Sequence, residues 1–264
     1  MTIRVLPTKF SSEGETIRGN FVLPEGDGVF AGICKFHGFP GSSDQVSGIA
    51  TRLAEAGFAV LTFDFRGFRS SDGYFSLAGE IKDAQAAVKH FLASGHISPE
   101  WVGLYAASYG ATVAIIEAIN NPLITAIALR APVYDPLAFA QSPLVPAAID
   151  ELLRTSPDVM HGLTEPDIRA GVINRMIQDA TQYNAMKEIH KLTCPLFIIT
   201  GDADQGIDLE GVKRLFEAAN EPKELVVVQG ADHNLTNPIA FEQTMEAIVA
   251  WFNHQFIHGD YLGI

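Results

Sequence analysis

Cysteine is scarce in this chain, in which only Cys34 and Cys194 occur among 264 residues. Two thiols are too few for the disulfide framework of a small secreted domain or for a cluster of metal ligands. Each cysteine stands in an apolar run that is typical of a buried strand, so we interpret both as core thiols. The sequence therefore predicts no disulfide framework and no metal centre.

Basic residues are also few, because Lys and Arg total 18 against 31 Asp and Glu, which gives a formal net charge of -13. A nucleic-acid partner requires a basic stripe, and none is visible. No run of about 20 apolar residues could span a bilayer, and the start, MTIRVLPTKF, lacks the apolar region of a signal peptide. We therefore expect no nucleic-acid partner, no membrane association and a cytoplasmic location.

The rest of the composition is that of a soluble globular protein, with 47% hydrophobic and 19% charged residues. A chain of this length can bury a large core, as one sizeable α/β domain or two small ones. We expect one domain with an insertion.

Strand patterns and helix patterns alternate along most of the chain. The stretches TIRVLPTKF and ETIRGNFVLP alternate in polarity and predict antiparallel edge strands. Further on, apolar runs such as FAVLTFDF, WVGLYAAS and PLFIITGD predict buried strands, and LAGEIKDAQAAVKHFLASG is one of several helical segments between them. Strands that are apolar on both faces and separated by helical crossovers indicate an α/β fold with a mostly parallel sheet flanked by helices.

This alternation stops between Pro132 and Cys194. Residues 133–193 contain several prolines, yet a compact domain rarely leaves so long a segment unstructured. The stretches AAIDELLRT, EPDIRAGVINRMIQDA and QYNAMKEIHKL have helical spacing. We predict a small helical cap insertion at 133–193, placed over one end of a core formed by residues 1–132 and 194–264.

Ser108 lies in the stretch GLYAASYGATV, at an expected turn from a strand to a helix. Reactive groups of open α/β sheets gather at the carboxyl ends of the strands. Ala106 and Gly110 are small enough for the backbone to turn sharply and lift the hydroxyl clear of the sheet. A serine hydroxyl is a poor nucleophile alone, so it requires a base, a group that orients the base and donors for a developing oxyanion.

The stretch AASYG at 106–110 resembles the nucleophile elbow Gly-X-Ser-X-Gly of the α/β-hydrolases, with alanine in the first glycine place. The family's order of serine, acid and histidine is met by Ser108, the GDAD stretch at 201–204, and His233. Within the family, the chain looks most like compact carboxylesterases of the cinnamoyl or feruloyl esterase type and the related serine peptidases. The resemblance covers nearly the whole chain and implies an α/β-hydrolase fold.

His233 follows the last expected strand, where this family keeps its histidine. A neutral imidazole accepts the serine proton and returns it to the leaving group. The side chain of Asp232 has difficulty reaching the ring of the adjacent His233. The family's Gly-X-X-Asp pattern implies Asp204 as the orienting acid and leaves Asp202 second. The candidates for this acid are Asp202, Asp204, Asp208 and Asp232.

The stretch HGFPGS at 37–42 resembles the family's oxyanion loop, although glycine and proline also occur in plain turns. The resemblance implies the backbone N–H groups of Phe39 and Tyr109 as oxyanion donors, since Pro40 has no N–H. We interpret His37 as a brace for the loop. The stretch DFRGFRSSDG resembles a structural segment of the family, in which Asp64 and Arg66 hold the loop beneath the site.

The sequence thus predicts a serine hydrolase that cleaves carboxylic esters and uses Ser108, His233 and Asp204, without a cofactor or a metal. An amide, thioester or carbon–carbon bond hydrolase with the same residues is an alternative, because a triad does not identify its leaving group. A non-catalytic binding protein on this fold is a further alternative. We expect a small-molecule ester as partner and consider a homodimer.

Four residues are candidates for substrate binding. Tyr74 follows the DFRGFRSSDG stretch, and the other three belong to the apolar side chains of the insertion. These apolar side chains either form an acyl or aryl pocket or pack the insertion onto the body. The four candidates are Tyr74, Phe139, Leu144 and Met160.

Overall fold

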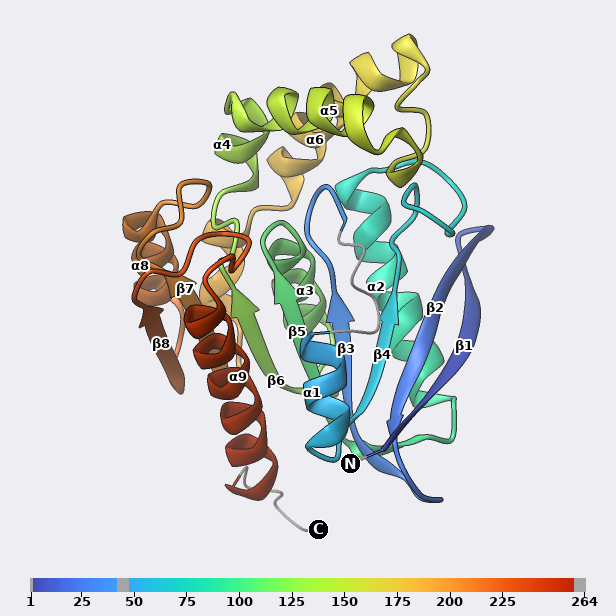
Figure 1. Cartoon of the computed structure of the whole chain (residues 1–264), viewed down its shortest axis with the longest axis vertical. Helices are drawn as coiled ribbons and strands as arrows, with labels where there is room; N and C mark the ends of the chain where they lie inside the picture. Colours follow the sequence, from blue (N-terminus) through green and yellow to red (C-terminus); the bar gives the residue numbers. More distant parts are fainter. Residues whose placement is uncertain (1, 42–47, 259–264) are drawn as a thin grey trace.

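Figure 1 shows the computed structural model of the chain, in which helices lie on both faces of a twisted sheet and residues 2–41 and 48–258 are described. The eight strands of these ranges run in the order β1-β2-β4-β3-β5-β6-β7-β8. Only the pairs β1 with β2 and β2 with β4 are antiparallel. The strands are β1 (Ile3–Ser12), β2 (Glu15–Pro24), β3 (Phe30–Phe36), β4 (Ala59–Phe63), β5 (Ile97–Ala107), β6 (Ile124–Arg130), β7 (Leu196–Gly201) and β8 (Lys223–Val228).

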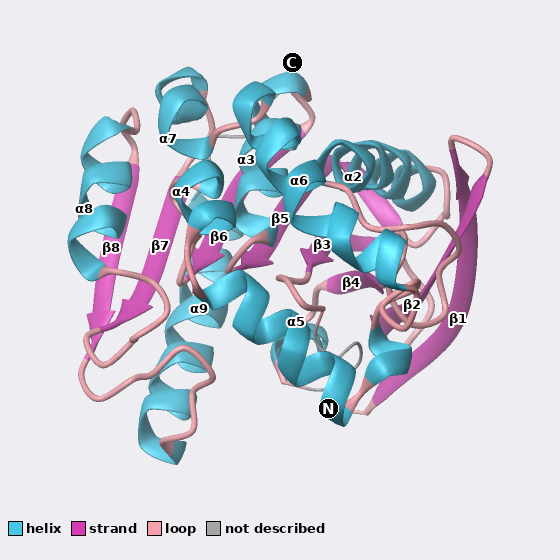
Figure 2. Ribbon diagram, turned by 90° about the horizontal axis from the view of Figure 1, so that it is seen from above, coloured by secondary structure: helices cyan, strands magenta, loops and turns pink. Residues whose placement is uncertain are grey.

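The helices form two layers, and Figure 2 shows them on either side of the sheet when the molecule is viewed from above. One core lies between the sheet and the layer that contains α2, α3 and α8. A second core lies between the other face and α1 with α9. The helices are α1 (Ile49–Glu55), α2 (Leu77–Leu92), α3 (Gly110–Asn120), α4 (Pro136–Gln141), α5 (Leu144–Thr155), α6 (Pro166–Gln182), α7 (Ala185–Glu188), α8 (Leu209–Ala218) and α9 (Pro238–His258). This arrangement confirms the predicted α/β fold with a mostly parallel sheet.

Helix α2 illustrates how the sequence sets an element that supports the site. Its buried side chains recur every three or four residues, so they form one apolar face against the sheet. The hydroxyl of Ser76 accepts a hydrogen bond from the Gly79 N–H at 3.0 Å and caps the first turn. The apolar face includes Leu77, Ile81, Ala84, Val88 and Phe91.

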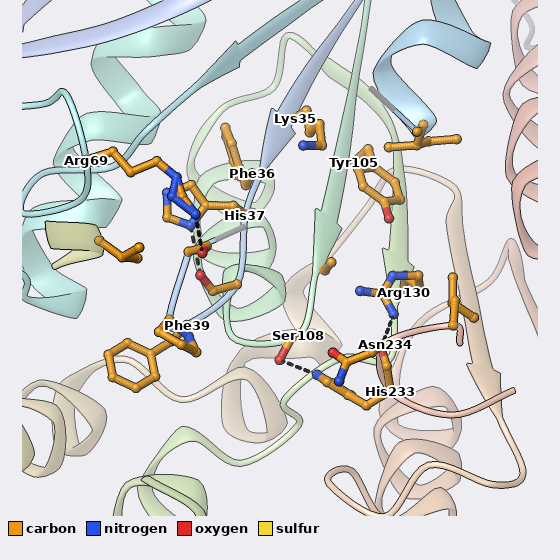
Figure 3. Close-up of a pocket in the computed structure, with 18 of the residues that line it drawn as sticks. Lys35, Phe36, His37, Phe39, Arg69, Tyr105, Ser108, Arg130, His233 and Asn234 are labelled. Atoms are coloured by element: carbon orange, nitrogen blue, oxygen red, sulfur yellow. Dashed lines mark hydrogen bonds between the residues drawn. The ribbon is translucent and has the colours of Figure 1, made fainter. Parts of the chain in front are cut away.

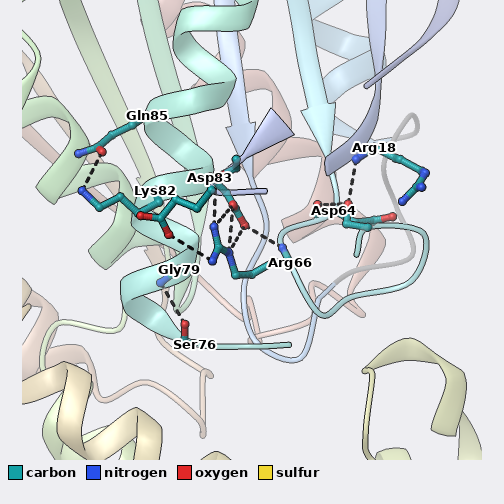
Figure 4. Close-up of polar contacts among 11 residues, drawn as sticks. Arg18, Asp64, Arg66, Ser76, Gly79, Lys82, Asp83 and Gln85 are labelled. Carbon is teal, nitrogen blue, oxygen red and sulfur yellow. Dashed lines mark hydrogen bonds and ion pairs between the residues drawn. The ribbon is translucent and has the colours of Figure 1, made fainter. Parts of the chain in front are cut away.

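The loop after β4 is fixed by buried polar contacts, which Figure 4 shows. The guanidinium of Arg66 donates to the Asp83 carboxylate from Nη2 at 2.8 Å and from Nε at 3.1 Å, and the Asp83 side chain is fully buried. Asp64 accepts a hydrogen bond from the Ser70 hydroxyl at 3.0 Å. Both residues hold the loop, in agreement with the structural role inferred for them.

The segment between β6 and β7 forms helices α4 to α7, and α4, α5 and α6 lie above the carboxyl ends of the strands (Figure 1). Helix α4 was not anticipated from the sequence pattern. Its N-cap is Asp135, whose carboxylate accepts hydrogen bonds from two backbone N–H groups at 3.1 Å. Met160 and Phe68 form an isolated antiparallel β-bridge, and the His161 N–H donates to the Gly67 carbonyl at 2.8 Å. These contacts anchor the segment to the loop after β4.

Two details differ from the expectations. The stretch QYNAMKEIHKL is not one helix, because Asn184 caps the short α7 and a 3₁₀ turn follows at Ile189–Lys191. These turns pack beside α3 and α8. Cys194 precedes β7 and is only partly buried, whereas Cys34 is buried within β3 as expected. Ser42 and the first residues of the helical stretch VSGIATRLAEAG lie outside the described residues.

None of the helices within the described ranges is long and apolar enough to cross a membrane.

Candidate active site

Ser108 sits in a sharp turn between the end of β5 and the start of α3, and its φ angle is 53°. Few residues other than glycine adopt this left-handed conformation, and it persists only where the surroundings hold it. The Ser108 N–H donates to the Arg130 carbonyl at 2.9 Å, and its carbonyl accepts from the Val133 N–H at 3.0 Å. A Cβ at Gly110 would lie 2.3 Å from the His37 carbonyl oxygen, so this position admits only glycine. The backbone therefore presents the Ser108 hydroxyl at the carboxyl edge of the sheet.

The structure brings His233 between Ser108 and Asp204. Nε2 of His233 lies 3.1 Å from Oγ of Ser108, and Nδ1 lies 2.7 Å from Oδ2 of Asp204. The Asp204 side chain is 1% exposed and that of His233 is 28% exposed. Because the carboxylate accepts only, the Nδ1 proton belongs to the histidine and leaves Nε2 free to accept from the serine hydroxyl.

The Asp204 carboxylate is held from both of its oxygens. Its Oδ1 accepts hydrogen bonds from the backbone N–H groups of Gly206 and Ile207, each at 2.8 Å. Burial alone raises the pKa of Asp204, but the hydrogen bond and charge of His233 and these two amides outweigh burial and lower the pKa below its ordinary value. The acid next to the imidazole is therefore the carboxylate anion at neutral pH.

The other three acids considered for this place are engaged elsewhere. Asp202 accepts from the Gly230 N–H at 2.6 Å and ties β7 to the turn after β8. Asp208 caps α8 through two N–H groups of its first turn. Asp232 accepts from the Thr236 N–H at 2.9 Å. Among the four carboxylates, Asp204 is the one that contacts His233.

The loop from His37 to Gly41 lies directly against the serine, because a Cβ at Gly38 would lie 2.9 Å from the Ser108 Cβ. The His37 ring braces this loop. Its Nε2 accepts from the Phe65 N–H at 2.9 Å, and its Nδ1 lies 2.8 Å from the Gly38 carbonyl. Since Nε2 is an acceptor, Nδ1 carries the proton and donates to Gly38.

The phenyl ring of Phe39 and the phenol ring of Tyr109 pack together at a centroid distance of 6.1 Å, and both side chains are buried. Tyr109 is the residue before α3 and Phe39 lies one residue beyond Gly38. Tyr109 thus follows Ser108 in the chain, and Phe39 follows the glycine that lies against Ser108.

The buried His37 ring should make the fold acid-sensitive. Burial lowers the pKa of His37 from 6.5 to about 3, so between these values the unfolded chain binds a proton that the native protein does not. Stability is consequently lost as the pH falls below about 6.5, by up to roughly 1.4 kcal/mol per pH unit. We expect the His37→Gln variant to lose about 2 kcal/mol less unfolding free energy than the wild type between pH 7 and pH 5.

Urea unfolding at both pH values measures this difference. The variant His190→Gln, which removes an exposed imidazole, is the control. Equal pH dependence in the wild type and His37→Gln would contradict the assignment of His37 as a buried neutral imidazole.

A cavity of about 580 Å³ opens beside Ser108 and His233 (Figure 3). Its lining includes Phe39 of the loop after β3. Residues of α5 and the turn after it close one side, namely Leu152, Ser156 and Val159. The serine hydroxyl and the imidazole therefore face a space large enough for a small-molecule substrate.

The four substrate contacts inferred from the sequence do not line this cavity. Met160 is 2% exposed and packs the cap onto the loop after β4. The Phe139 ring packs on that of Tyr109 at 5.7 Å. Tyr74 and Leu144 are 51% and 42% exposed, outside the described lining of the cavity. Phe139 and Met160 thus pack the insertion onto the body.

Sequence reasoning missed several polar residues of the cavity wall, among them Lys35, Arg130 and Asn234. Arg130 ends β6, in the stretch LITAIALRAP, so the predicted carboxyl edge of the sheet already placed it near Ser108. Asn234 follows the histidine directly. Within the described ranges, no three His, Cys, Asp or Glu side chains are grouped to hold a metal ion.

A strained serine at a strand-to-helix turn, linked through a histidine to a buried carboxylate, is the arrangement found in α/β enzymes with a nucleophile elbow. The chain belongs to the alpha/beta hydrolase family, because the family model described as "Alpha/beta hydrolase family" matches residues 36–251. This confirms the family prediction. Membership of the family supports a hydrolytic activity.

Similar sequences come from bacteria and a virus. An uncharacterized protein of Mycobacterium tuberculosis, Rv2307c, is 27% identical over 79% of this chain, and the match spans 64% of that protein. The monoglyceride lipase homolog of Monkeypox virus is 24% identical over 75% of this chain and 80% of its own length.

Solved structures share the fold at lower sequence identity. The Butyrivibrio proteoclasticus protein Est1E, solved with ferulic acid bound, gives a TM-score of 0.71 at 18% identity and covers 95% of this chain and 99% of its own. A Pyrococcus furiosus esterase gives a TM-score of 0.71 at 19% identity over 96% of this chain and 91% of its own.

Proposed function

We propose that this protein is a serine hydrolase that cleaves carboxylic esters through an acyl-enzyme. The observation that carries the proposal is the continuous hydrogen-bonded line from Asp204 through His233 to Ser108 at the wall of an open cavity. A nucleophile, a base and an orienting acid within hydrogen-bond reach are the geometric requirement for this chemistry.

In the first half of the reaction, Nε2 of His233 takes the proton of the Ser108 hydroxyl while Oγ bonds to the ester carbonyl carbon. The backbone N–H groups of Phe39 and Tyr109 stabilise the oxygen that becomes negative, and the positive end of α3 adds to this effect. The carbon–oxygen bond to the alcohol then breaks, and the alcohol leaves with the proton from His233. Asp204 stabilises the imidazolium that forms in between.

In the second half, a water molecule gives a proton to Nε2 of His233 and its oxygen bonds to the acyl carbon. Collapse of this second intermediate releases the carboxylic acid and returns the proton to Ser108. The reaction needs no further reagent than water. Amides, thioesters and ketones could enter the same cycle, so the leaving group must be tested directly.

Three of the comparisons favour an ester over these alternatives. One similar protein is named a monoglyceride lipase homolog, a second is named an esterase, and a third was solved with ferulic acid bound. We therefore propose an ester, with an alcohol or phenol as leaving group, as the first substrate class to assay.

A neutral alkyl fluorophosphonate should label the protein on Ser108 alone. Oγ of Ser108 displaces fluoride and keeps the phosphonyl group, so intact mass and peptide mapping locate the adduct. Heat-denatured protein is the control, because labelling requires the folded contact with His233. Failure of the native protein to react would remove the nucleophile from the proposal and favour a non-catalytic binding protein on this fold.

A further inference from the structure

The cavity continues beyond Ser108 along one face of the sheet. Lys35 of β3 pairs with Tyr105 of β5, and Ala107 of β5 pairs with Arg130 of β6. Alternate residues of a strand point to the same face, so Lys35, Tyr105 and Arg130 share the face that α1 and α9 cover. Figure 3 shows these three side chains together on the side of the cavity away from Phe39.

The wall of the cavity is basic, although the chain as a whole is acidic. Lys35, Arg69 and Arg130 line the cavity, and no Asp or Glu is found among the described residues of its lining. The formal charge of the whole chain is -13, and the acidic side chains of the described residues lie outside this lining.

Arg69 and Arg130 have different surroundings. Arg69 donates to the Gly41 carbonyl at 3.1 Å, and its Nε lies 3.9 Å from Oδ1 of Asp64. Arg130 donates from Nη1 to the His233 carbonyl at 2.8 Å, and no described carboxylate lies within ion-pair distance of it. The guanidinium of Arg130 thus has a single hydrogen-bond partner among the described residues, next to the base of the proposed reaction.

An arginine in this position is suited to an anionic ligand. A guanidinium has five N–H donors in a planar fork, and one is used here. The remaining edge matches the two oxygens of a carboxylate, and charge-assisted pairs of this kind are about twice as strong as neutral hydrogen bonds. A substrate that brings its own carboxylate would complete the coordination of Arg130 beside the reacting serine.

We propose that Arg130 binds a carboxylate of the substrate, so that the preferred esters carry a second, ionised carboxyl group. This inference rests on the proposed function and narrows its substrate class. The ester lies at Ser108, and the carboxylate lies in the basic part of the cavity beside Tyr105 and Arg130.

Arg130 also has a structural role that a test must separate. The backbone carbonyl of Arg130 accepts a hydrogen bond from the Ser108 N–H, and its guanidinium donates one to the His233 carbonyl. An Arg130 variant will therefore lose activity on every ester. The preference for an anionic ester over a neutral ester of the same length is the informative quantity, because displacement of His233 lowers both rates together.

Matched esters test the proposal. The anionic series comprises monomethyl esters of dicarboxylic acids from succinic to suberic acid and acetyl esters of ω-hydroxy acids. The neutral series comprises the methyl and alkyl acetate esters of equal length. We expect the wild type to show a kcat/KM at least about ten-fold higher for the best anionic ester, since hydrogen bonds to charged groups differ from neutral ones by this order.

Arg130→Gln should bring the ratio of kcat/KM for the anionic ester to kcat/KM for the neutral ester close to one. Arg130→Lys should restore part of the preference. Lys82→Gln, which removes an exposed positive charge from α2, should keep the wild-type ratio. The proposal would be overturned if the wild type hydrolysed the monomethyl dicarboxylates and the acetyl hydroxy acids with a kcat/KM no higher than that of the neutral esters. An undiminished ratio in Arg130→Gln would also overturn it.

Calorimetry on Ser108→Ala separates this inference from the proposed function. Monomethyl adipate should bind this variant, and the double variant with Arg130→Gln should bind it at least about ten-fold more weakly. If Ser108 fails to react with the fluorophosphonate but this difference in binding persists, the hydrolase proposal is wrong and the anion site stands. If Ser108 reacts and the difference is absent, the anion site is wrong and the hydrolase proposal stands.

Discussion

Ser108→Ala should lower kcat for a simple ester such as 4-nitrophenyl butyrate by roughly six orders of magnitude, the size of the loss when the nucleophile of a well-studied serine protease is removed. The hydroxyl supplies the atom that bonds to the carbonyl carbon, and no other hydroxyl contacts His233 among the described residues. The main-chain hydrogen bonds of residue 108 to Arg130 and Val133 involve only backbone atoms, so the turn persists in the variant.

The measurement combines initial rates with a thermal unfolding scan. Ser98→Ala, at the opposite end of β5, is the matched control and should keep the wild-type rate. A Ser108→Ala protein that unfolds normally and retains more than a few per cent of the activity would show that another residue attacks the ester.

The positions of Ser108, Asp204 and His233 could be predicted because they depend on chain order and strand ends. Each follows an apolar run that forms a parallel strand, namely β5, β7 or the edge strand β8, and the carboxyl ends of parallel strands meet at one edge. The resemblance to the α/β-hydrolases, through their Gly-X-X-Asp pattern, then selected Asp204 over the other three candidate acids. The hydrogen bonds of the four carboxylates explain that choice physically.

The cap was harder to predict, because apolar periodicity shows that a helix has a buried face and does not show what that face contacts. Phe139 and Met160 have the composition of a pocket wall, yet they pack against Tyr109 and the loop after β4. Leu152 and Val159, which do line the cavity, have the same chemical character. Only the path of the chain distinguishes the two pairs.

Arg130 was missed for a different reason. A charged residue at the end of an apolar strand is most often solvated, and the stretch LITAIALRAP contains no other polar signal of a site. Its significance comes from strand register, which pairs it with Ala107, two residue pairs beyond Tyr105 and Ala128 and on the same face of the sheet.

Asp204→Asn should lower kcat by roughly 10⁴ and leave the fold intact. Oδ1 of Asp204 accepts two backbone N–H groups, so an asparagine must place its carbonyl oxygen there and turn its NH₂ group toward His233. An NH₂ group at that place donates to Nδ1 and forces the imidazole proton onto Nε2. His233 then cannot accept the proton of Ser108, and the opposite orientation would set the NH₂ group against two N–H donors.

Asp202→Asn is the matched control, because it makes the same chemical change two residues earlier in the same loop. Asp202 accepts a single N–H, from Gly230, and the carbonyl oxygen of asparagine can accept it equally well. Steady-state kinetics of both variants on one ester, with unfolding scans to verify their folds, measure the difference. A larger loss in Asp202→Asn than in Asp204→Asn would show that Asp204 is not the orienting acid. The path proposed here for the proton from Ser108 would then be wrong as well.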